Sequence, residues 1–144
     1  MAVNSNQLDT MMEGWFRKLP ALPPGGVNAI YSITPWLALI FGILGVLGAI
    51  SAFGVLSVFA PFAMYGGAHN YGLGLVATVG WGISSLMMLI AFPALKAGKL
   101  SGWNLLFWSE VVNVVTSVIG ISVGSVVGAL IAFYILYQIK PKYK

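Results

Sequence analysis

Charged residues are scarce in this chain of 144 residues, and cysteine is absent. Asp, Glu, Lys and Arg make up only 7% of the residues, against about 25% in soluble domains. The mean hydropathy is +0.93. A soluble fold could not cover its surface with so few charges, so the composition predicts an integral membrane protein. The absence of cysteine excludes disulfides, thiolate nucleophiles, CxxC redox pairs and cysteine metal sites.

Other groups that carry chemistry are also few. His69 is the only histidine, so one chain supplies neither bis-histidine haem ligation nor a zinc site. No nucleophile lies in a pattern with a general base, and we therefore expect no enzyme, no cofactor and no metal. The net charge of +4 does not indicate nucleic acid, because the basic residues lie at the ends of hydrophobic runs.

Residues 1–34 are predicted to form a cytoplasmic segment with an amphipathic helix at about 7–19. Asn6 is a candidate N-cap, and Glu13 can pair with Arg17 one turn later. Two placements stay open for this helix: on the bilayer surface, or packed against the end of the membrane bundle. Its apolar positions follow helical spacing: Leu8, Met11, Met12, Trp15, Phe16 and Leu19.

The rest of the chain predicts an all-α polytopic membrane protein, with four transmembrane helices in an antiparallel bundle. The spans are expected at about 35–60, 71–93, 102–120 and 123–139, with a basic cytoplasmic tail at 140–144. Thr34-Pro35 should begin the first span, and Pro61 should end it before an uncharged loop reaching His69. Caps are expected at Asn70 and Ser101, with a tight connection at Ile121–Gly124.

The basic residues give the orientation. With four spans, every Lys and Arg falls on one side of the membrane, which predicts both termini in the cytoplasm. We therefore expect a multi-pass protein of the cell inner (plasma) membrane. The residues concerned are Arg17, Lys18, Lys96, Lys99, Lys140, Lys142 and Lys144.

Three stretches, PWLALIFGILGVLGAI, GKLSGWNLLFWSEVVNVV and GALIAFYILYQIKPKYK, carry a resemblance that covers the whole chain. In these the chain is similar to small uncharacterised four-helix bacterial membrane proteins. That resemblance implies a four-span topology and a bacterial origin, and it implies no activity.

Glu110 is the only charge inside a long hydrophobic run, and it defines a candidate intramembrane polar site. Asn113 shares its helical face, and counting from the span ends places Ser84, Ser85 and Tyr134 at a similar depth. Tyr134 and either serine could donate hydrogen bonds to the carboxyl group. One interpretation is a neutral glutamate that joins helices, and the other is a proton- or cation-responsive site.

Small residues in the first two spans predict close helix packing, and this seam comprises Gly42, Gly45, Gly48, Ala49, Ala52 and Gly80. The chain also resembles small multidrug-resistance transporters in having four spans and a membrane glutamate. Their glutamate lies in the first span, whereas Glu110 lies in the third, and their aromatic motif is not matched.

Three classes of function follow. The first is a structural, accessory or assembly protein, homo-oligomeric through the seam or bound to other membrane subunits. The second is a proton- or cation-coupled transporter that uses Glu110. The third is a binder of an apolar ligand such as a lipid, quinone or carotenoid. The bilayer is the one partner that all three share.

Overall fold

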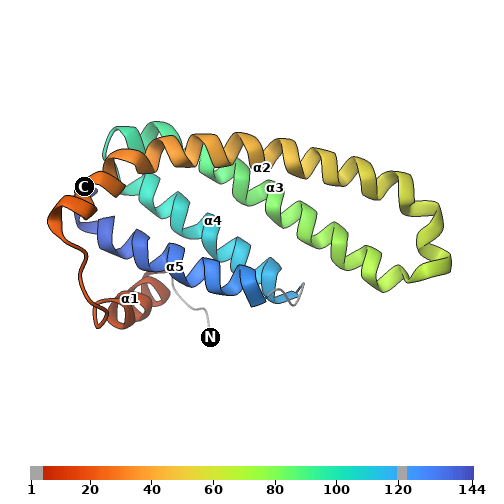
Figure 1. Cartoon of the computed structure of the whole chain (residues 1–144), viewed down its shortest axis with the longest axis horizontal. Coiled ribbons are helices and arrows are strands. Elements are labelled where there is room, and N and C mark those ends of the chain that lie inside the picture. Colours follow the sequence, from red (N-terminus) through yellow and green to blue (C-terminus); the bar gives the residue numbers. More distant parts are fainter. Residues whose placement is uncertain (1–4, 120–122) are drawn as a thin grey trace.

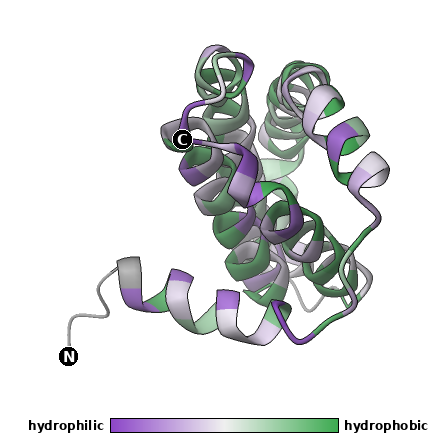
Figure 2. Cartoon of the chain, turned by 90° about the vertical axis from the view of Figure 1, so that its left-hand side faces the viewer, coloured by the Kyte–Doolittle hydropathy of each residue, from purple (hydrophilic) through white to green (hydrophobic). Residues whose placement is uncertain are grey.

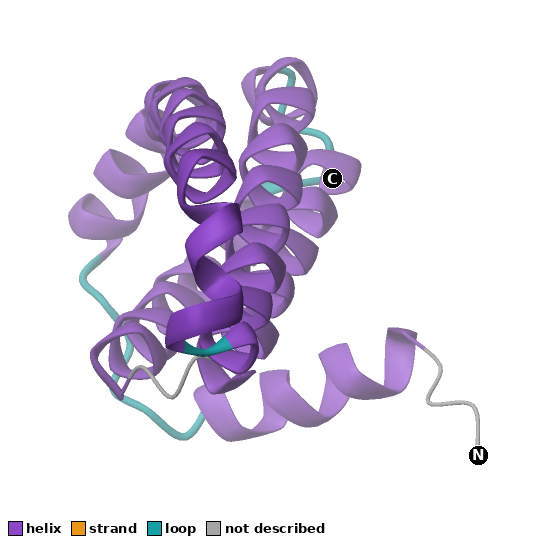
Figure 3. Ribbon diagram, turned by 90° about the vertical axis from the view of Figure 1, so that its right-hand side faces the viewer, coloured by secondary structure: helices purple, strands orange, loops and turns teal. Residues whose placement is uncertain are grey.

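The computed structural model describes residues 5–119 and 123–144, and in those residues the fold is all-α, as predicted (Figures 1 and 3). The described part contains five α-helices, a short 3-10 helix and no strand. The elements are α1 (Ser5–Phe16), α2 (Pro24–Gly66), α3 (Ala68–Lys96), α4 (Leu100–Ile119), α5 (Val123–Ile139) and η1 (Lys140–Lys142).

The prolines in α2 do not end the helix where the sequence suggested. α2 begins at Pro24 and continues through Pro35 and Pro61, so the predicted start at Thr34-Pro35 and the predicted loop at 61–69 are both wrong. Thr34 lies inside the helix and donates its hydroxyl to the Ile30 carbonyl at 2.6 Å. Without competing water, a helix in an apolar environment keeps its remaining backbone hydrogen bonds, and it therefore tolerates an internal proline.

Glycine, rather than the polar residues we expected, lies at two of the helix boundaries. Gly67, with φ of 128°, is the single residue between α2 and α3. Gly98, with φ of 69°, ends the turn after α3, where Lys99 N–H donates to Ala94 and Gly98 N–H to Leu95. This pair of bonds is the Schellman arrangement, which favours glycine. The predicted caps are therefore wrong: Asn6, Asn70 and Ser101 each lie within a helix.

α2 and α3 form a long hairpin that extends beyond the shorter pair α4 and α5 (Figure 1). α2 has 43 residues, or about 64 Å of helix, whereas α4 has 20 residues and about 30 Å. Leu56 of α2 still contacts the Gly74 position of α3 beyond the end of α4, so the two long helices remain paired toward the tip. The tip residue Tyr65 is 93% exposed.

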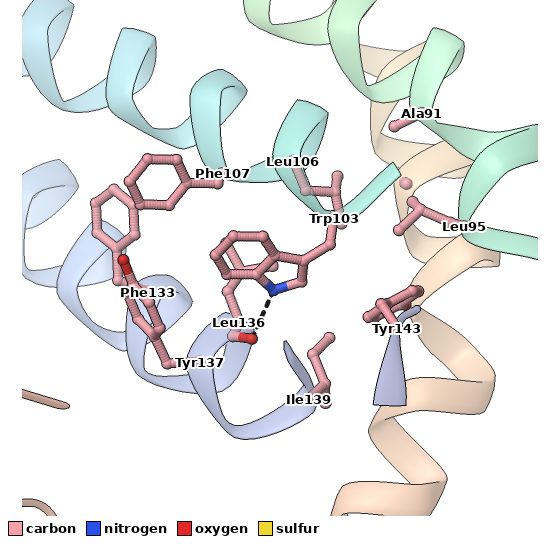
Figure 4. Packing of buried hydrophobic residues seen from close by; sticks show 11 residues of the cluster. Ala91, Leu95, Trp103, Leu106, Phe107, Phe133, Leu136, Tyr137, Ile139 and Tyr143 are labelled. Atoms are coloured by element: carbon pink, nitrogen blue, oxygen red, sulfur yellow. Dashed lines mark hydrogen bonds between the residues drawn. The ribbon is translucent and has the colours of Figure 1, made fainter. Parts of the chain in front are cut away.

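An aromatic cluster fills the space between α4 and α5 near the C-terminal end of the chain (Figure 4). Trp103 is completely buried and donates its indole N–H to the Leu136 carbonyl at 2.8 Å. Its ring stacks on Phe107, and Phe107 in turn contacts Phe133. These large rings pack α4 and α5 together at this end of the bundle.

The basic segment 140–144 is docked against the bundle. Tyr143 is 5% exposed and packs its ring on Tyr31 of α2. Lys144 exchanges backbone hydrogen bonds with the α3–α4 turn, accepting from Leu100 and donating to Gly98. The C-terminus therefore closes one end of the bundle.

Among the described residues, three helices are long and apolar enough to cross a membrane: α2, α3 and α5 with its η1 extension. α4, which carries Glu110, is not one of the three. Figure 2 shows hydrophobic colours along the bundle, with hydrophilic residues gathered on α1 and at the end nearest the viewer. Most large apolar side chains of α2 are exposed, as expected for a protein whose solvent is lipid.

Candidate functional site

Glu110 is half-buried and takes part in a short chain of polar contacts between α3 and α4. Its partner is the side chain of Asn113, one turn further along α4. The amide oxygen of Asn113 accepts a hydrogen bond of 2.9 Å from the Ser84 hydroxyl on α3. Glu110, Asn113 and Ser84 therefore lie together, and two of the three share one helix face, as the spacing predicted.

The other residues predicted for this site are engaged elsewhere. The Tyr134 hydroxyl donates to the carbonyl of Pro20 in the α1–α2 linker. Ser85 donates to the Trp81 carbonyl of its own helix at 2.7 Å. Neither bond involves the carboxyl group of Glu110. Counting residues from the span ends gave a similar depth but could not give the direction in which each side chain points.

The small-residue seam lies inside the chain, between α2 and α3. A Cβ atom at Gly42 would meet the Leu89 side chain at 2.7 Å, and one at Gly48 would meet the Trp81 ring at 2.6 Å. Gly45 faces Ser85 in the same way. These glycines let the backbones of α2 and α3 approach closely. The face of α2 that carries them is therefore already covered by α3 of the same chain.

Two of the remaining seam positions, Ala49 and Gly80, also face neighbouring helices of the same chain. A Cβ atom at Gly82 of α3 would lie 3.5 Å from the Ala49 Cβ. Gly80 faces Thr116 of α4, so it belongs to the next helix interface. Ala52 is half-buried on the same helix as Ala49.

A second polar cluster, which the sequence reasoning missed, fixes α1 to the end of α5. Lys140 Nζ lies 2.8 Å from Asp9 and 2.9 Å from Glu13, and Glu13 also pairs with Arg17 at 2.7 Å. The Tyr137 hydroxyl donates to Asp9 at 3.1 Å. The predicted Glu13–Arg17 pair is therefore confirmed as part of a larger network. A sequence signal existed: two carboxylates one turn apart on α1, in a chain that has only one other.

The electrostatics of this cluster favour the charged forms. The hydrogen bond from Lys140 lowers the pKa of Glu13 below its usual value, and this outweighs the opposing effect of burial. Burial by itself lowers the pKa of Lys140, but the hydrogen bonds to Asp9 and Glu13 leave that pKa raised. Lys140 also lies 4.7 Å from the centroid of the Trp103 ring, which adds a cation–π contact.

An apolar groove of about 890 Å³ lies between α1 and α5. Phe16 closes one side by stacking on Tyr137 with ring centroids 5.3 Å apart. A smaller and more polar cavity, of about 500 Å³, shares Phe16 and Leu19 with the groove and is lined also by Arg17 and Gln138. The groove is lined chiefly by Leu8, Met11 and Trp15 of α1 and by Val127, Leu130 and Ile131 of α5. Neither cavity is lined by Glu110.

Within the residues described, no group of three or more His, Asp or Glu side chains is placed to hold a metal ion. His69, predicted to lie in a loop, is exposed in the first turn of α3. No protein-family model, no curated protein and no solved structure matches the chain.

Proposed function

We propose that this chain is a small integral membrane protein of structural or accessory type, crossing the bilayer four times. α4 also counts as a span in this proposal, the third in chain order, because it packs along α3 and its glutamate has a partner within the chain. At about 30 Å and about 26 Å, α4 and α5 match the hydrocarbon core of a bilayer. The tip of the α2–α3 hairpin then lies toward the opposite side of the membrane.

The arrangement of charge supports this orientation. Every Lys and Arg lies in the α1–α2 linker, at or beside the α3–α4 turn, or after α5. Figure 1 shows these three segments at one end of the bundle. The hairpin tip carries no Lys, Arg, Asp or Glu. Basic residues stay on the cytoplasmic side of a membrane protein, so both termini are cytoplasmic in the proposal.

The single observation that favours a packing role over transport is the way that polar groups in the spans are satisfied. Ser84 of α3 bonds to Asn113 across the interface with α4, and Asn113 bonds to Glu110 within α4. Thr78 and Thr116 donate to carbonyls of their own helices at 2.8 Å. Groups that bond locally stabilise helix contacts, whereas a transport path requires polar groups that face a water-filled route.

Substitutions at Glu110 test the packing role. Glu110→Gln keeps the shape and the hydrogen bond, so the unfolding midpoint in detergent should stay close to that of the wild type. Glu110→Ala should cost about 1–3 kcal/mol, because it opens a gap and leaves Asn113 short of a partner. Transport is tested separately in vesicles that hold a pH or cation gradient. Dissipation of the gradient by the wild type but not by Glu110→Gln would overturn the packing role in favour of transport.

A second candidate function, the binding of an apolar ligand, is favoured by one specific observation, the groove between α1 and α5. It is compatible with the accessory role, because a bound lipid can be part of a membrane protein's fold.

A further inference from the structure

The side of α1 that faces away from the Lys140 cluster is apolar and open. Trp15 is 77% exposed and Met11 is 65% exposed, although both lie on a helix that is fixed in place. Lys140 holds α1 through Asp9 and Glu13 on its polar side. The fixed polar side leaves the apolar side directed along α5, where it forms one wall of the groove.

The groove is preformed on its other sides as well. The outer surface of α5 supplies the second wall, and the linker closes the end, because Tyr134 bonds to the Pro20 carbonyl. Leu22 N–H is bonded to the side chain of Gln138 at 3.3 Å, which ties the same linker to α5 again. The volume of about 890 Å³ lies within the range of about 300–1,000 Å³ usual for small-molecule sites.

The chemistry of the lining selects a hydrocarbon chain. Nearly all of the lining is carbon, and the polar side chain among the lining residues, Tyr134, uses its hydroxyl for Pro20. A ligand with polar groups along its length would leave those groups without hydrogen bonds inside the groove. A flexible acyl chain has none to satisfy.

The charge around the groove selects the head group. This end of the molecule carries seven Lys and Arg side chains against the two carboxylates Asp9 and Glu13, a net charge of +5. Both carboxylates are already paired, with Lys140 and Arg17. Lys18, next to the groove residue Leu19, is exposed. Basic residues near a membrane surface attract anionic lipids.

We propose that the groove between α1 and α5 binds an acyl chain of an anionic phospholipid from the cytoplasmic leaflet, with the head group beside the basic end of the linker. This site rests on the proposed membrane orientation, which places α1 at the cytoplasmic surface. α1 then acts as a clamp: its polar side is anchored to the protein, and its apolar side holds a lipid against α5.

Quenching of tryptophan fluorescence by brominated lipid tests the site, because Trp15 lines the groove. The protein is placed in nanodiscs of phosphatidylcholine that contain a small fraction of brominated phosphatidylglycerol or, separately, brominated phosphatidylcholine. The contribution of Trp15 is the difference between the wild type and Trp15→Phe. We expect the anionic lipid to quench Trp15 about fivefold more effectively per molecule, the factor that one basic residue near the surface contributes.

Two matched variants locate the effect. Val127 lines the groove and is 51% exposed, whereas Val115 on α4 is 53% exposed and does not line it. Val127→Phe should reduce the quenching of Trp15 by filling the groove, and Val115→Phe should leave it unchanged. Lys18→Gln should weaken the preference for the anionic lipid.

Equal quenching by both lipids in proportion to their mole fractions would show ordinary surrounding lipid only and would overturn the site. An anionic preference that survives Val127→Phe would also overturn it. The membrane orientation is tested independently by labelling from each side. Correct labelling without a lipid preference would refute the lipid site alone, and incorrect labelling would refute the proposed function.

Discussion

Replacing Gly45 by alanine is expected to destabilise the α2–α3 hairpin. A Cβ atom at Gly45 would lie 2.9 Å from the Ser85 Cβ and would overlap its hydroxyl oxygen. The hydroxyl could rotate away, but the Ser85 Cβ is fixed to the α3 backbone, so the two helices must separate locally. Overpacking of this kind costs about 1–3 kcal/mol.

Gly54→Ala on the same helix is the matched control, because nothing lies within 4 Å of a Cβ at Gly54. There alanine should stabilise the helix by about 0.5–1 kcal/mol through its lower conformational entropy in the unfolded chain. The two alanine variants should therefore shift stability in opposite directions, although the chemical change is the same.

A double-mutant cycle assigns the cost to the contact itself. Ser85→Gly removes both overlapping atoms and leaves the Trp81 indole nitrogen at an ordinary 3.5 Å. Combined with Gly45→Ala, it should recover about 1–2 kcal/mol relative to the sum of the single changes. Unfolding in mixed detergent micelles, followed by circular dichroism, provides the free energies. Equal stability of Gly45→Ala and Gly54→Ala would refute the packing described for this interface.

Three further predictions concern the end of the bundle that carries the basic residues. Lys140→Met should release α1, because it leaves Asp9 and Glu13 without their shared partner. Hydrogen exchange of the α1 amides should then become fast. Unchanged protection of these amides would contradict the role of Lys140. The pKa of Glu13 is lowered in the folded state, so the stability that Glu13 contributes is present above its unfolded pKa and is lost as the pH falls through its folded pKa. Protection of the α1 amides in the wild type should therefore fall on acidification, and Lys140→Met should show little further loss. Burial raises the pKa of Tyr143 to about 12, so the stability that it contributes is complete below pH of about 10 and declines above that value. The Tyr143 hydroxyl is buried with no hydrogen-bond partner among the described residues. In thermal unfolding, Tyr143→Phe should therefore be at least as stable as the wild type at neutral pH, and its stability should decline less above pH of about 10. A clear loss of stability at neutral pH would contradict this prediction.

Composition and spacing were sufficient to predict the helical class and the last helix. α5 has the predicted bounds, Val123–Ile139, because a mostly apolar run ends there, shortly before Pro141. The helix ends predicted at Pro35 and Pro61 were wrong, because the effect of a proline on a helix depends on the surrounding solvent. The amphipathic helix was predicted at about 7–19 and is found at Ser5–Phe16, packed against α5 by its Phe16 ring.

The candidate site was predictable only in part, because spacing fixes neighbours within one helix but not between helices. Glu110 and Asn113 share a face of α4 and are in contact, as expected. The depth count placed Ser84 near this pair, but its hydroxyl donates to Asn113 and not to the carboxyl group of Glu110 as expected. Tyr134, predicted at the same depth, bonds to the linker. The Lys140 cluster joins residues about 130 positions apart, so the two carboxylates on α1 indicate a basic partner but not which one.

Accessibility labelling of single cysteines tests the four-span orientation most directly, because the natural chain contains no cysteine. Lys18→Cys and Lys99→Cys should react with a membrane-impermeant maleimide only after the cytoplasmic side is opened. Tyr65→Cys, at the tip of the α2–α3 hairpin, should react in intact cells. Labelling of position 18 or 99 from outside intact cells, or protection of position 65 there, would contradict the proposed topology.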